Sequence, residues 1–71
     1  MKTKAELLEK LIEETQVQIW RAEIDQEFFK KLQLRALSTK EADEAQRAMR
    51  SMQAVVESGQ MRLEFLKEQN K

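Results

Sequence analysis

The sequence predicts an all-α fold, an antiparallel helical hairpin of two long helices with coiled-coil-like packing that self-associates into a four-helix bundle or a larger helical oligomer. Ala, Glu, Lys, Leu and Arg make up 39 of the 71 residues, with one Gly and no Pro, as is typical of long helices. Two patterns of Ser or Thr followed three residues later by Glu mark helix starts, and a heptad-like apolar seam follows each start. We expect one domain over residues 1–71.

The first helix is predicted over about residues 3–37. Thr3-Lys4-Ala5-Glu6 fits a capping box, in which the Thr and Glu side chains satisfy amides of the first helical turn. Beyond it, one stripe contains Ala5, Leu8, Ile12, Thr15, Ile19, Ala22, Gln26, Phe29, Gln33 and Ala36. Its polar members Thr15, Gln26 and Gln33 are explained by selection of the pairing register. A buried hydrogen-bonding site for a ligand is the alternative.

The turn is predicted at about residues 37–40 and the second helix over about 39–69. Ser38-Thr39-Lys40-Glu41 is a second capping box, and Leu37 and Ala42 are placed to form a weak hydrophobic staple. The seam of this helix is Ala42, Ala45, Met49, Met52, Val56, Gly59, Leu63, Leu66 and Asn70. A connection this short makes the two helices antiparallel neighbours.

Gly59 lies within the seam of the second helix. A glycine inside a helix costs about 1 kcal/mol relative to alanine, so its presence needs a structural reason. One explanation is a hole that admits Ile19, which the pairing of the two seams places opposite Gly59, or Trp20 of another subunit. The other is a break at Ser58-Gly59 that begins a short third helix.

Large apolar residues outside the seams form two further stripes. On the first helix a candidate self-association stripe contains Val17, Trp20, Ile24 and Phe28, and on the second a candidate partner face contains Ala54, Met61 and Phe65. Exposed stripes with Trp and Phe usually mark interfaces. Packing in a homo-oligomer, binding of a different partner or ligand, and incidental surface exposure are the three explanations of these stripes.

The distribution of charge favours an antiparallel dimer. Residues 1–29 carry a net charge of −3 and residues 30–50 a net charge of +3, within a chain of zero net charge. Hairpins stacked head to tail place these opposite charges side by side, whereas a parallel pairing places like charges together. The resulting layout resembles that of Rop, the small plasmid copy-number protein, although no sequence motif is shared.

The available side chains argue against catalysis. Without Cys, His or Tyr, the chain cannot form thiolate or imidazole metal sites, Ser-His-Asp triads or disulfides. It also contains no Gly-rich phosphate loop. We therefore expect no enzymatic activity, no metal and no cofactor. Because no signal peptide or membrane-spanning segment is evident, we expect a cytoplasmic protein without a membrane partner.

The leading functional prediction is a small oligomeric interaction protein, an adaptor, assembly factor or regulator that binds a protein partner through its apolar helix faces. The alternative is a small RNA- or nucleotide-binding bundle, of the kind that viruses and plasmids encode. Its anion-binding face would be the basic residues near the turn: Lys30, Lys31, Arg35, Arg47 and Arg50. The zero net charge and pI of about 6.3 argue against it, because nucleic-acid-binding proteins usually carry a basic field.

Overall fold

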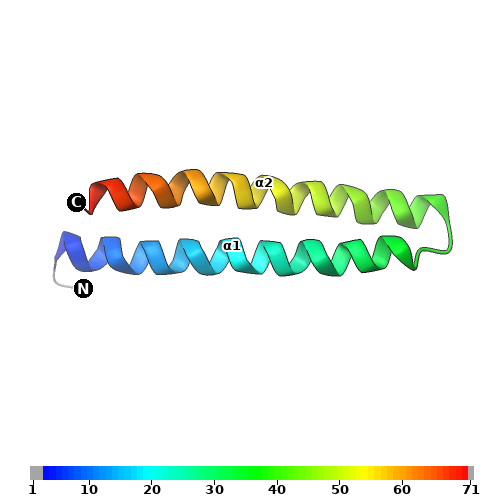
Figure 1. Cartoon of the computed structure of the whole chain (residues 1–71), viewed down its shortest axis with the longest axis horizontal. Helices are drawn as coiled ribbons and strands as arrows, with labels where there is room; N and C mark the ends of the chain where they lie inside the picture. The colour runs from blue at the N-terminus through cyan, green and yellow to red at the C-terminus, as the bar shows by residue number, and fades with distance from the viewer. Residues whose placement is uncertain (1–2, 71) are drawn as a thin grey trace.

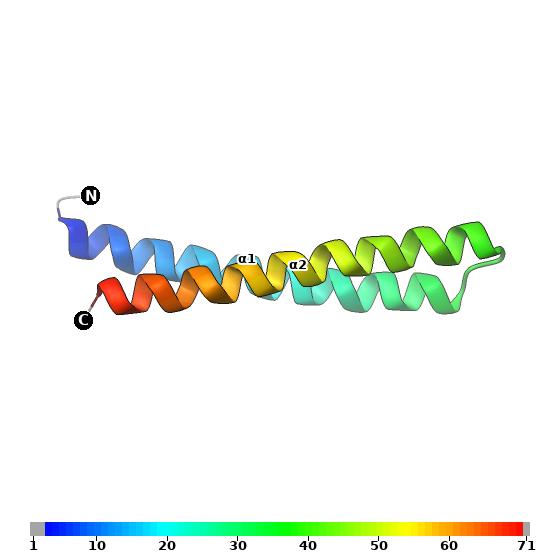
Figure 2. The same cartoon turned by 90° about the horizontal axis from the view of Figure 1, so that it is seen from above.

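The computed structural model describes residues 3–70, which form two antiparallel α-helices, α1 (Lys4–Leu34) and α2 (Thr39–Gln69) (Figure 1). The helices lie side by side along their whole length and cross each other in the second view (Figure 2). The Cα atoms extend over 53 Å along the longest axis. These features confirm the predicted helical hairpin. Residues 1, 2 and 71 of the predicted domain lie outside the described residues.

Both predicted helix starts are confirmed. The hydroxyl of Thr3 accepts a hydrogen bond from the Glu6 amide at 3.1 Å, and the hydroxyl of Ser38 accepts one from the Glu41 amide at 3.2 Å. Both cap residues have the extended backbone that this arrangement requires. The Glu41 carboxylate accepts from the Leu37 amide at 3.1 Å, one residue before the cap. This contact ties the connection to the start of α2.

The first helix ends earlier than predicted. It stops at Leu34 rather than near residue 37, and the connection covers residues 35–38 rather than 37–40. The Arg35 amide bonds the carbonyls of Lys31 and Leu32, which tightens the last turn. The chain must leave the helix before Ser38, because the capping residue needs an extended backbone. The expected staple is wrong: Leu37 is 94% exposed, so nothing buries it.

The hairpin buries the two predicted seams. The buried residues of the described chain all belong to them: Thr15, Ile19 and Ala22 on α1, and Ala45, Val56 and Leu66 on α2. The centre of the core is formed by the contact cluster of Ile19, Ala22 and Val56, with Met52 and Leu63 packed against it. The seam therefore closes most tightly midway along the helices, whereas Ala5 and Asn70 at its open end are exposed.

The polar members of the α1 seam have hydrogen-bond partners within the hairpin. The Gln26 amide group donates to Gln53 across the seam at 2.7 Å, and Gln33 donates to Gln46 at 3.3 Å. The Thr15 hydroxyl, in a side chain that is 2% exposed, donates to the Leu11 carbonyl at 2.7 Å. Because the two Gln–Gln bonds connect specific positions of α1 and α2, they favour one register of pairing.

Gly59 provides space for Ile19. The α2 helix continues through it, so the alternative of a break at Ser58-Gly59 is wrong. A Cβ atom at Gly59 would lie only 2.7 Å from Ile19 Cγ1 and 3.3 Å from its Cδ1. A β-branched side chain has one strongly preferred rotamer in a helix, so Ile19 cannot easily turn away. The missing side chain thus allows the two helices to approach at the centre of the core.

We expect Gly59→Ala to destabilise the hairpin by about 1 kcal/mol or more, because overpacking exceeds the gain in helix propensity. The matched control compares two substitutions at the exposed neighbour Ser58. There the variant Ser58→Ala should be more stable than Ser58→Gly by about 1 kcal/mol. Urea unfolding followed by circular dichroism, at one fixed protein concentration, measures both differences. An alanine that stabilises both positions equally would contradict the proposed fit of Ile19.

Candidate interaction surface

The outer stripe of α1 is exposed along the middle of the helix. Ile24 lies two residues beyond the buried Ala22, about 200° around the helix, so it points away from α2. Residues three and four apart share a helix face, which places the neighbouring stripe residues in the same row. The exposed fractions across the stripe range from 41% to 67% for Val17, Trp20, Ile24 and Phe28. The predicted self-association residues thus form one accessible surface.

One ring contact and one groove lie between this stripe and the rest of the hairpin. The Phe28 and Phe29 rings meet edge to face, with centroids 5.4 Å apart and planes at 64°. Since Phe29 belongs to the seam, this contact links the stripe to the core. At the other end, Val17 and Trp20 help to line a groove that includes Leu63 and Lys67 of α2. Phe28 thus contacts a seam residue and Trp20 borders a groove shared with α2, while both side chains stay more than half exposed.

Leu32 extends the same surface and is absent from the sequence-based prediction. It lies four residues beyond Phe28 and is 43% exposed, so the helical period alone could have identified it. Its side chain also lines the groove near the turn, together with Phe29 and Ala45. Leu32 therefore lies between the outer stripe and the seam.

The predicted partner face lies on the outside of α2. Met61 follows the seam residue Gly59 by two positions, so it points away from α1. Met61 is 73% exposed and Phe65 is 51% exposed, and Ala54 is exposed as well. The stripes of α1 and α2 are thus separate surfaces on the two outer sides of the hairpin.

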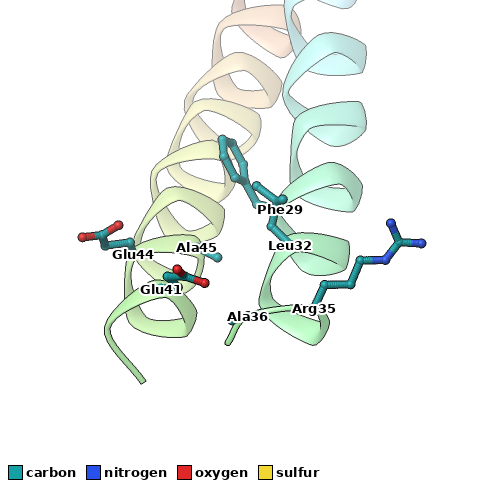
Figure 3. Close-up of a pocket in the computed structure, with 7 residues that line it drawn as sticks. All are labelled: Phe29, Leu32, Arg35, Ala36, Glu41, Glu44 and Ala45. Carbon is teal, nitrogen blue, oxygen red and sulfur yellow. The ribbon is translucent and has the colours of Figure 1, made fainter. Parts of the chain in front are cut away.

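The basic residues near the turn are exposed but interspersed with acidic ones. Arg35 lines the groove at the turn together with Glu41 and Glu44, and its guanidinium group extends away from α2 (Figure 3). Arg47 and Arg50 line a separate shallow hollow with Asp43 and Gln46. Lys30 and Lys31 are exposed on α1. Arg35 and the pair of Arg47 and Arg50 thus line two separate hollows, each of which also includes at least one acidic residue.

The described residues include no group of three or more His, Cys, Asp or Glu that could hold a metal ion. In the same part of the chain, neither helix has the length and apolar character needed to cross a membrane. Every buried side-chain nitrogen or oxygen of residues 3–70 has a hydrogen-bond partner. The distinctive feature of the surface is therefore its exposed apolar side chains.

Comparisons of the chain with protein-family models, with curated proteins and with solved structures gave no match.

Proposed function

We propose that this chain is a small self-associating interaction protein, an adaptor, assembly factor or regulator that binds a protein partner through the outer faces of its hairpin. One observation carries the proposal. Eleven large apolar side chains of the described residues are 41–94% exposed, whereas the buried apolar residues are Ile19, Ala22, Ala45, Val56 and Leu66. Two of those five are alanines. Seven of the eleven lie in the two outer rows, which hold Val17, Trp20, Ile24, Phe28 and Leu32 on α1 and Met61 and Phe65 on α2. Exposed apolar side chains gathered in this way are typical of binding surfaces.

The energetics of a two-helix unit support self-association. A core of this size rarely contributes more than about 3–5 kcal/mol. Burying one Val, Ile or Phe side chain adds roughly 1.5–3 kcal/mol relative to leaving it in water. Covering the row around Trp20, Ile24 and Phe28 would therefore stabilise the helices themselves as well as join two chains. Folding and assembly would be coupled in such a protein.

The outer face of α2 provides the surface for a different protein. Met and Phe suit recognition of an apolar partner, since Met adapts its shape and an aromatic ring supplies a large contact area. Because Met61 and Phe65 point away from α1, a dimer formed through the α1 stripe would leave them accessible. One hairpin could then self-associate through α1 and hold its partner through α2.

The geometry gives less support to nucleic-acid binding. Asp43 lines the same hollow as Arg47 and Arg50, whereas the guanidinium group of Arg35 points away from α2, which carries Glu41 and Glu44 (Figure 3). Negative charge beside a basic residue weakens its attraction for phosphate. The second experiment below distinguishes RNA or nucleotide binding from binding of a protein.

We expect the pair of substitutions Trp20→Glu and Phe28→Glu to convert the assembled protein into monomer or unfolded chain, because buried carboxylates are strongly unfavourable. Light scattering and circular dichroism measure the two effects. The matched control, Met61→Glu with Phe65→Glu, should leave self-association unchanged. A wild-type protein that is a fully helical monomer at about 100 µM would contradict self-association, since at that concentration even a micromolar dimer is nearly complete.

We expect Phe65→Ser to reduce capture of the protein partner from the native host by at least tenfold, while helicity and assembly size stay nearly constant. Gln at Lys31, Arg35, Arg47 and Arg50 should change capture little, and binding should weaken only slightly as salt rises. The nucleic-acid alternative gives the reverse result. The logarithm of affinity would fall linearly with the logarithm of salt concentration, and the Gln substitutions would abolish binding.

A further inference from the structure

We propose that the occupant of the α1 stripe is a second copy of this chain, bound antiparallel about a twofold axis that passes beside Ile24. The inference rests on the self-association in the proposed function and specifies its surface, orientation and register. Its consequence is that the two α1 helices contact each other, while the α2 helices lie on the outside of the assembly with Met61 and Phe65 uncovered.

The positions of the apolar side chains define the register. Trp20 lies four residues before Ile24 and Phe28 lies four residues after it, and all three side chains are more than half exposed. An antiparallel pair centred on Ile24 places Ile24 against its own copy. It also sets Trp20 in the same layer as Phe28 of the second copy, on both sides of the axis. This arrangement alternates a larger and a smaller ring in each layer, which suits close packing.

The charges at the two ends of the stripe select the orientation. Glu13 and Glu14 are exposed at its beginning and share a shallow hollow with Val17. Lys31 and Arg35 are exposed at its far end, beyond Phe28. In the antiparallel register, Val17 faces Lys31 of the second copy, and Glu14 lies beside Arg35 of that copy. A parallel pairing would instead place carboxylates against carboxylates and cations against cations.

Each exposed ion pair contributes little to affinity, so the apolar row supplies the attraction and the charged ends decide its direction. Because of the twofold axis, the dimer contains this arrangement twice. In each, the acidic end of one chain lies beside the basic end of the other. A slip of one helical turn in either direction would move Trp20 away from Phe28 of the second copy, although in one direction Glu13 would still face Lys31 of that copy. The apolar row therefore determines the register, and the charged ends determine the orientation.

Disulfide trapping in the full-length chain tests this register, because the sequence contains no Cys. We expect Ile24→Cys to form a covalent dimer rapidly on mild oxidation. Val17→Cys alone should not, because in the antiparallel register the two copies of position 17 are about 21 Å apart, at about 1.5 Å per residue, whereas a disulfide needs Cα atoms within about 7 Å. A mixture of Val17→Cys and Lys31→Cys chains should form the mixed dimer.

The exposed position Glu57 on α2 supplies the background rate, through the variant Glu57→Cys. Ile24→Cys that oxidises no faster than Glu57→Cys would overturn the inference. So would rapid dimerisation of Val17→Cys alone and of Lys31→Cys alone, which is the pattern of a parallel pair. A wild-type monomer at about 100 µM would overturn the inference as well. The capture assay with Phe65→Ser is separate from these tests, so partner binding can survive their failure.

Charge reversal tests the orientation independently. Glu13→Lys with Glu14→Lys, and separately Lys31→Glu with Arg35→Glu, should each weaken self-association at least about fivefold, because both end clusters become repulsive. Mixing the two variants should restore dimers as heterodimers near the wild-type affinity. The matched control is Glu57→Lys with Glu64→Lys, which changes the net charge by the same amount as the first variant but on α2. It should have little effect on self-association. Equal weakening by this control, or no weakening by either variant, would overturn the assigned orientation.

Discussion

The close approach of the two helices at Ile19 and Gly59 is the constraint on which the hairpin depends. A two-helix unit has one seam, so its core must be dense where it is formed. Gly59 leaves the space that Ile19 Cγ1 occupies, and Ala22 and Val56 complete the cluster beside it. The helix propensity lost at the glycine, about 1 kcal/mol, is offset by contacts that a larger residue would prevent.

The single seam also explains the exposed surfaces. Each helix has apolar residues on two sides, but one neighbour can cover only one side. Trp20, Ile24 and Phe28 therefore remain in contact with water on α1, and Met61 and Phe65 remain so on α2. The edge-to-face contact of Phe28 with Phe29 joins the exposed stripe of α1 to the seam of the same helix. Exposed apolar surfaces of this kind are expected to bind other molecules.

The separation of the two stripes has a functional consequence within our proposals. Surfaces on opposite outer sides of one hairpin can bind different molecules without competing. The α1 stripe has acidic and basic ends, which gives it a complementary match in a second copy of itself. The α2 stripe is shorter and rests on Met61 and Phe65, so it suits an apolar feature of another protein.

Much of the fold was determined by the sequence alone. The two capping boxes placed the helix starts, and the three-and-four spacing identified each residue that is buried among residues 3–70, because a two-helix fold is decided by local signals and one periodic contact. Tertiary structure decided what local signals do not contain. Residues 35–38, rather than 37–40, form the connection, because the geometry of the reversal sets where α1 must end. Gly59 leaves space for Ile19 and does not break α2. The sequence allowed both explanations, since only the distance between the helices distinguishes them. Glu41 and Glu44 likewise line one groove with Arg35 only when the chain folds back, whereas Asp43 and Arg47 are neighbours within α2 because they lie four residues apart.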